Sequence, residues 1–141
     1  MKAADMKFED IKKGDEFAFT KKITRDDVMD FARIMGNFNP LHVDDEYGKR
    51  SKFGKPIVFG MQAASLFSTL LGMYCPGKKA LCLSQTLNFR LPLFFEDTVT
   101  VKGTVIAINE AIKILTVKTE ILKDDNVCIS GEAKVTVIEQ K

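Results

Sequence analysis

The sequence is short of the residues that most often carry chemistry by themselves. It contains one histidine and three cysteines in 141 residues. Cys75, Cys82 and Cys128 have no CxxC spacing, and one histidine cannot complete a zinc site with them. A catalytic cysteine also needs a neighbouring base, and only His42 could serve. We therefore expect no metal and no cofactor, and we interpret the three cysteines as buried, reduced thiols.

Long apolar runs and a strong charge imbalance are also missing. The formal net charge is +2, and the lysines form isolated pairs such as Lys12-Lys13 and Lys78-Lys79 without interleaved aromatic residues. No apolar stretch approaches the ~20 residues of a membrane span, and residues 1–10 lack the apolar run of a signal peptide. These features predict a cytoplasmic protein that binds neither nucleic acid nor membrane.

What is present is an ordinary globular composition. Hydrophobic residues make up 45% of the chain and charged residues 28%, which argues against disorder. A chain of 141 residues can bury a core without disulfides or metals. We therefore predict a single domain over residues 1–141.

The first half of the chain predicts two helices separated by a long loop. Thr24 and Asp27 have the spacing of a capping box, and Gly36 ends the helix that follows. Residues 37–57 show no regular period, and long ordered loops are usually functional. Residues 61–73 are apolar nearly all round, so we expect a helix that is buried nearly all round. The apolar face expected for the first helix consists of Val28, Phe31, Ala32 and Met35.

The second half of the chain reads as consecutive strands. Apolar residues alternate with polar ones in three long segments, which is typical of an antiparallel sheet with one buried face. The links near Asn109-Glu110 and Asp124-Asp125-Asn126 are short enough for hairpins. The buried positions expected are Val99, Val101, Val105, Ala107, Leu115, Val117, Ile121, Val127, Ile129, Ala133, Val135 and Val137. Because an all-round apolar helix needs partners on every side, the sheet is expected to wrap around it.

The single histidine, His42, follows the first predicted helix in a turn-rich stretch. Histidine is the side chain best suited to moving a proton near neutral pH, and loops often carry function. His42 is therefore a candidate catalytic residue, although a lone histidine is more often structural.

Several motifs surround this histidine and continue along the chain. They are Phe31-Ala32-x-x-x-Gly36-Asn37-x-Asn39-Pro40-Leu41-His42-x-Asp44, Phe53-Gly54-Lys55-Pro56-Ile57-Val58-Phe59-Gly60-Met61, and Gln85-x-x-x-Phe89-x-x-Pro92. In order and spacing they resemble the MaoC-like, (R)-specific enoyl-CoA hydratases of the hot-dog fold. The resemblance implies an α+β protein in which a five- to seven-stranded antiparallel sheet wraps the 61–73 helix, usually as a dimer.

The resemblance also implies a reaction on acyl thioesters of CoA or acyl carrier protein. In such enzymes an Asp and a His flank a water that adds across the double bond of a trans-2-enoyl thioester, and the pair moves the two protons. The matching residues here are Asn37 and His42, and the amide of Gly60 or a neighbour polarises the thioester carbonyl. The family pattern has Asp in place of Asn37 and commonly His in place of Phe59. An amide can hydrogen-bond a water but cannot accept its proton at neutral pH.

A further set of residues is assigned to substrate binding. It consists of Asn39, Phe53, Gly54, Phe59, Met61, Ser65 and Gln85. Phe53 and Phe59 lie where an acyl tunnel needs apolar walls, and Gly54 lets the backbone approach a ligand. Gln85 is expected to hydrogen-bond to the loop of His42.

Structural interpretations of the same residues remain open. Asn37 and Asn39 also suit turns, and Ser65 suits a hydrogen bond to its own helix. Asp44 suits a structural role or the orientation of His42. Phe53 and Phe59 could belong to the core.

Three functions are consistent with these motifs. The first is an active hydratase or dehydratase of (R)-3-hydroxyacyl thioesters, with His42 doing most of the acid–base work and Asn37 holding the water. The second is a hot-dog thioesterase, in which His42 activates water for hydrolysis. The third is a binding protein that keeps the pocket without the chemistry.

Overall fold

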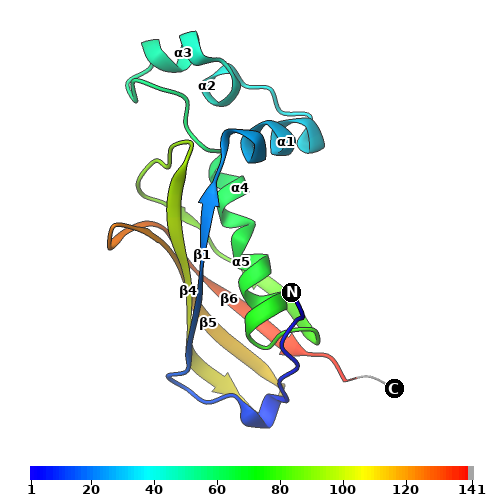
Figure 1. Cartoon of the computed structure of the whole chain (residues 1–141). Coiled ribbons are helices and arrows are strands. Elements are labelled where there is room, and N and C mark those ends of the chain that lie inside the picture. The colour runs from blue at the N-terminus through cyan, green and yellow to red at the C-terminus, as the bar shows by residue number, and fades with distance from the viewer. Residues whose placement is uncertain (140–141) are drawn as a thin grey trace.

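The computed structural model describes residues 1–139, which form an antiparallel sheet packed against a central helix (Figure 1). In this part of the chain the sheet has six strands in the order β1-β4-β5-β6-β2, and β3 pairs with β6. The strands are β1 (Glu16–Ile23), β2 (Ala80–Gln85), β3 (Asn88–Phe89), β4 (Asp97–Asn109), β5 (Ile114–Lys123) and β6 (Asn126–Val137). The predicted α+β class and antiparallel sheet are confirmed.

The three long strands follow the predicted alternation because one face of the sheet is covered by the helix. Val99, Val101 and Val117 are fully buried on this face. Val127 and Val137 are only half-buried, and Ala107 is exposed although it shares the parity of Val105. A register shift between Val105 and Ala107 explains the difference, because an extra residue in one strand reverses the faces that follow.

The central helix covers the predicted segment but is not uniform. It consists of α4 (Gly60–Ala64), α5 (Leu66–Thr69) and a π-helical turn, Leu70–Tyr74. Phe67 and Leu70 point into the core, and both are nearly inaccessible. The expectation of burial nearly all round is wrong for this chain, because Met61 is 61% exposed and Ser65 is also exposed. One face of the helix has no covering element among residues 1–139 because the sheet lies only against the other side.

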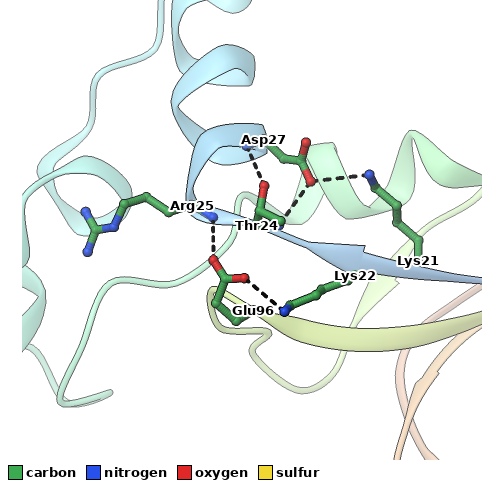
Figure 2. A network of polar contacts seen from close by, with 6 residues as sticks. All are labelled: Lys21, Lys22, Thr24, Arg25, Asp27 and Glu96. Carbon is green, nitrogen blue, oxygen red and sulfur yellow. Dashed lines mark hydrogen bonds and ion pairs between the residues drawn. The ribbon is translucent and has the colours of Figure 1, made fainter.

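The first helix, α1 (Arg25–Met35), is fixed at both ends by the residues that predicted it. The side chain of Thr24 accepts a hydrogen bond from the Asp27 amide while Asp27 accepts one from the Thr24 amide, and Gly36 ends the helix with φ of 67°. Figure 2 shows that Glu96 joins this junction by accepting from the Arg25 amide at 3.1 Å and pairing with Lys22. These contacts fix the angle at which the chain leaves β1.

The apolar face of α1 is narrower than predicted. Val28 and Ala32 are completely buried. Met35 is 59% exposed, because it lies in the last turn of the helix beyond the covered part of the core.

The segment predicted as a loop contains two short helices. These are α2 (Pro40–Val43) and α3 (Asp45–Arg50). Asn39 caps α2 through a hydrogen bond from the Leu41 amide, and Asp44 caps α3 through one from the Tyr47 amide. Both are too short to show a hydrophobic period, so the sequence pattern did not reveal them. Together α1, α2 and α3 gather at one end of the sheet (Figure 1).

Burial of the cysteines differs from the prediction at one position. Cys75 and Cys128 are buried, whereas Cys82 is exposed because it lies on the edge strand β2. None of the helices formed by residues 1–139 combines the length and the apolar character that a membrane-spanning helix requires. The same residues contain no cluster of three or more His, Cys, Asp or Glu side chains that could hold a metal ion.

Candidate active site

His42 is the third residue of α2, so it lies in a short helix rather than in a loop. Its Nδ1 lies 2.7 Å from the carbonyl oxygen of Ile57. Because a carbonyl can only accept, Nδ1 must carry the proton in this contact, and the lone pair of the neutral ring is on Nε2. Among residues 1–139, Nε2 has no hydrogen-bond partner. The fold therefore presents a nitrogen that can accept a proton.

The ring of His42 is also held by an aromatic neighbour. Phe59 stacks on it with centroids 4.0 Å apart and ring planes 25° from parallel. Phe59 packs in turn against Phe31 at 5.2 Å and is 3% exposed. The side chain at this position therefore restricts the orientation of the imidazole, in addition to forming part of the core.

Residues 57 and 58 connect His42 to the sheet side of the molecule. The Ile57 amide donates to Leu41 O at 3.2 Å, and the Val58 amide donates to Leu93 O at 2.8 Å. The carbonyl that orients His42 thus belongs to a segment bonded on both sides. The sequence did not identify Ile57 as the partner of His42, because any residue type can supply a backbone carbonyl.

Asn37 begins the turn that leads into α2. Its Oδ1 accepts a hydrogen bond from the Asn39 amide at 3.1 Å, and Asn39 Oδ1 accepts from Leu41 at 3.0 Å. Both contacts are Asx turns, so the structural interpretation of these two residues is confirmed. Asn37 is exposed, and its backbone amide donates to Ala32 O at 3.0 Å. Its side-chain nitrogen Nδ2 has no partner within the described chain, which leaves one polar group able to bind a water.

A cavity of about 410 Å³ lies beside these residues. Ile57 and Phe59, which both contact His42, form part of its wall, whereas His42 itself does not. The cavity is lined by Lys52, Phe53, Ile57, Val58, Phe59, Gly60, Ala63, Phe89, Arg90, Leu91, Pro92, Leu93 and Ile129. Its volume and mostly apolar wall suit a small acyl ligand.

Gly60 lies at the start of the central helix and at the cavity wall. Phe59, at the N-cap position, supplies no side-chain cap, so the first amides of α4 remain available to an acceptor. A Cβ atom at Gly60 would lie 2.8 Å from the ring of Phe89, which explains glycine at this position. A carbonyl oxygen in the cavity could accept from these amides.

The remaining predicted residues divide between the cavity and its surroundings. Phe53 and Phe59 line the cavity. Gly54 has φ of 75°, so a tight turn accounts for this glycine without a ligand. Met61 and Asn39 lie outside the cavity wall.

Two assignments are replaced by local contacts. Gln85 Nε2 donates to Thr119 Oγ1 and to Thr86 O, both at 2.9 Å, so the expected bond to the His42 loop is wrong. Ser65 Oγ donates to Gln62 O in its own helix, as the structural interpretation predicted. Asp44 caps α3, and the orientation of His42 comes from Ile57 instead.

Other groups at the site were not identified from the sequence. Phe89 belongs to the motif Gln85-x-x-x-Phe89-x-x-Pro92, but nothing in the sequence indicated that its ring packs on Gly60. Lys52 and Arg90 line the cavity from two separate segments, which only the tertiary structure brings together. Gln62 Oε1 is buried without a partner among residues 1–139, in a groove beside Phe31.

The buried thiol nearest the end of the central helix is unsuited to nucleophilic chemistry. Burial raises the pKa of Cys75 to about 11, and Asp15 contributes in the same direction. Since the thiolate is the nucleophile, this side chain is unreactive at neutral pH.

Comparisons with known proteins identify the family. The sequence pattern described as "MaoC like domain" matches residues 7–127. The chain belongs to the MaoC-like family. It is 38% identical over 131 residues to an (R)-specific enoyl-CoA hydratase of Aeromonas caviae, covering 92% of this chain and 98% of the relative. A 3-hydroxybutyryl-CoA dehydratase of Methylorubrum extorquens is 37% identical over 130 residues, covering 92% of this chain and 83% of the relative.

Solved structures confirm the hot-dog fold of this MaoC-like chain. The (R)-hydratase of A. caviae superimposes with a TM-score of 0.88 at 38% identity, over 91% of this chain and 98% of that one. The unliganded R-hydratase of Pseudomonas aeruginosa has a TM-score of 0.92 at 24% identity, covering 98% of this chain and 89% of that one, and supports the fold alone.

Proposed function

We propose that this protein catalyses the reversible hydration of trans-2-enoyl thioesters to (R)-3-hydroxyacyl thioesters. The observation that carries the proposal is the arrangement of His42, whose Nδ1 is fixed by Ile57 O at 2.7 Å while Nε2 has no partner among residues 1–139. Relatives that cover nearly the whole chain are named (R)-specific enoyl-CoA hydratase and 3-hydroxybutyryl-CoA dehydratase, which supports the same reaction.

The proposed reaction needs one base, one acid and one group that stabilises negative charge. His42 Nε2 removes a proton from water as the oxygen attacks C3, and the electron pair of the double bond moves toward the thioester carbonyl. The free amides at the start of α4, including that of Gly60, hydrogen-bond the resulting enolate oxygen. The His42 imidazolium then donates its proton to C2, which restores the neutral base.

Asn37 takes a supporting role in this proposal. Its Oδ1 is engaged by the Asn39 amide, and its nitrogen can donate to the oxygen of the attacking water. A carboxylate at this position could also share the proton, so the present residue leaves the acid–base work with His42.

The acyl group is proposed to occupy the cavity between Gly60 and the apolar side chains of Phe53, Phe89 and Leu93. The thioester is carried by CoA, which the names of the two relatives above contain, or by acyl carrier protein, the carrier named in a dehydratase of Arabidopsis thaliana that is 32% identical to this chain over 127 residues. A cytoplasmic location, a single domain over residues 1–141 and the absence of a cofactor stay predictions.

A coupled assay with crotonyl-CoA distinguishes the three functions. The enoyl absorbance should fall while the thioester remains intact and (R)-3-hydroxybutyryl-CoA accumulates. His42→Ala should reduce the rate by roughly 10²–10⁴-fold, the usual contribution of general acid–base catalysis. Release of free thiol without hydration would support the thioesterase, and binding without either product would support the binding protein. Either result overturns the proposal.

We also propose that the protein is a homodimer formed along β2. This edge strand exposes Leu81 at 45% and Leu83 at 51%, and an exposed apolar edge is a site for strand pairing. Sedimentation should give twice the chain mass of 15.8 kDa. Leu83→Lys should shift the protein to monomer, and a monomeric parent protein would refute the pairing.

A further inference from the structure

His42 is held by two residues of the cavity wall, although it does not line the cavity itself. Its Nδ1 donates to Ile57 O at 2.7 Å, and its ring stacks on Phe59 with centroids 4.0 Å apart. Ile57 and Phe59 both line the cavity of about 410 Å³. The orientation of His42 therefore depends on two residues that an acyl ligand in this cavity would contact.

The aromatic contact controls a movement that the hydrogen bond leaves open. A hydrogen bond tolerates some change in its angle, so the contact between Nδ1 and Ile57 O still allows the imidazole to tilt. Such a tilt displaces Nε2, the atom proposed to remove the proton from water. Phe59 opposes it, because its ring lies 25° from parallel to the imidazole, and among residues 1–139 no other aromatic ring stacks on His42.

Phe59 is itself supported unevenly. It packs against Phe31 with centroids 5.2 Å apart, and it is almost completely buried. Its place in the cavity wall means that part of its surroundings is not filled by protein atoms. A group beside such a space lacks packing contacts that a close-packed interior would provide. An acyl chain in the cavity would supply these contacts, so Phe59 should be held more firmly when a ligand is bound.

We propose that Phe59 is a positioning residue that makes the alignment of His42 depend on how well the acyl group fills the cavity. This role rests on the proposed function for the identity of the ligand. Binding energy from parts of a substrate remote from the reacting atoms raises kcat when it is used to align catalytic groups. A longer acyl group that fills more of the cavity should therefore react faster once bound.

Steady-state hydration of crotonyl-CoA and trans-2-hexenoyl-CoA measures this dependence. In the parent protein, kcat should be about threefold to tenfold higher for the longer substrate. Phe59→Leu keeps an apolar wall but removes the stacked ring, so kcat should fall about tenfold or more and should be the same for both substrates. The two substrates should still differ in KM, because the cavity that binds their chains remains.

Three further variants separate positioning from a general effect on packing. Phe53→Leu makes the same change at a cavity residue that does not stack on His42 within the described chain, so it should alter KM and keep the dependence of kcat on chain length. Phe59→Tyr keeps the stacked ring and should also keep this dependence.

Phe31→Leu loosens the support of Phe59 from outside the cavity wall and should weaken the dependence of kcat on chain length. It provides a second test if Phe59→Leu does not fold. Thermal unfolding of every variant identifies a loss of activity that comes from unfolding.

Nuclear magnetic resonance tests the contact without any turnover. His42 is the only histidine of the chain, so its imidazole signals can be identified without further substitutions. Butyryl-CoA and hexanoyl-CoA are saturated thioesters that cannot be hydrated. In the parent protein they should shift the His42 signals by different amounts, because the nearby ring of Phe59 moves with the filling of the cavity. In Phe59→Leu the two ligands should give the same His42 signals.

The outcomes distinguish this role of Phe59 from the proposed reaction. If neither enoyl thioester is hydrated, but the His42 signals respond to acyl length in the parent and not in Phe59→Leu, the positioning role is supported and the proposed function fails. If hydration proceeds and chain length changes only KM in the parent, the positioning role is overturned. It is also overturned if Phe59→Leu keeps the dependence of kcat on chain length, if Phe53→Leu removes it equally, or if neither saturated ligand changes the His42 signals.

Discussion

The sheet and the end of the molecule that holds His42 both contribute to the buried core, but they differ in the local interactions that hold their backbone. In β4, β5 and β6, buried apolar side chains such as Val99, Leu115 and Val117 face the central helix. In residues 24–59, here termed the cap, short helices begin at polar side chains that hydrogen-bond to nearby amides. The side chains of the cap that accept hydrogen bonds in turns or at helix N-termini are Thr24, Asp27, Asn37, Asn39, Asp44 and Ser51.

This difference shows how one residue can serve structure and chemistry together. Asn37 closes a turn through Oδ1 and still has a nitrogen that can face a water. His42 is held by a backbone carbonyl and a ring, so its orientation does not depend on the residue at position 37. We therefore expect a substitution at position 37 to leave the orientation of His42 unchanged.

The largest effect on stability should come from the buried side of the sheet. Leu115 is 0% exposed, and Leu115→Ala should lower the free energy of unfolding by about 2–5 kcal/mol, because a cavity remains. Urea denaturation measures this change. Ile112→Ala, at a residue 61% exposed in the turn before β5, should change stability by no more than about 0.5 kcal/mol. Equal losses of unfolding free energy in the two variants would show that the difference in burial does not determine the effect of the substitution.

An intermediate effect is expected at the start of the cap. Thr24→Ala removes the acceptor for the Asp27 amide and should cost about 1 kcal/mol. Thr98→Ala, at an exposed position of β4, is the matched control and should cost less. A loss at Thr24 as large as that of Leu115→Ala would contradict the assignment of the cap to local hydrogen bonds.

The smallest effect should depend on pH. Hydrogen bonding from the Thr24 amide, followed by contact with Lys21, lowers the pKa of Asp27 below its ordinary value. A depressed pKa in the folded state stabilises the protein above the unfolded pKa of about 3.9, and this contribution is lost as the pH falls through the folded pKa. Asp27→Asn should therefore be less stable than the parent at pH 7, with the difference disappearing in acid. A stability difference that persists in strong acid would show that the loss in Asp27→Asn does not come from the charge of Asp27.

The sequence predicted those features that repeat or that carry a local signal. Period-2 alternation revealed β4, β5 and β6, and the Thr24–Asp27 spacing revealed the start of α1. The bulge after Val105 could not be predicted, since residues 105–108 are all apolar and their pattern does not show which of them face the core. The helices α2 and α3 were hidden because four and six residues do not establish a period.

The candidate site was also predicted only in part, because some of its residues belong to a local motif and others meet only in the folded chain. The motif identified His42 and the cavity residues Phe53, Phe59 and Gly60. It did not identify Ile57 as the group that orients His42, because that contact is made by the backbone. Gln85 was assigned wrongly because its partner, Thr119, lies on a strand 34 residues away, which only the sheet register brings close.

The most direct test of the central claim compares crotonyl-CoA hydration by the parent protein, His42→Ala and Asn37→Asp, with thermal unfolding measured alongside. We expect measurable kcat/KM in the parent and a loss of about 10²-fold or more in His42→Ala. Asn37→Asp should gain about tenfold or more in kcat with an unchanged melting temperature, since Asp also closes an Asx turn and adds a proton acceptor. A parent protein at background, with hydration appearing only in Asn37→Asp, would contradict the claim that His42 alone sustains the reaction.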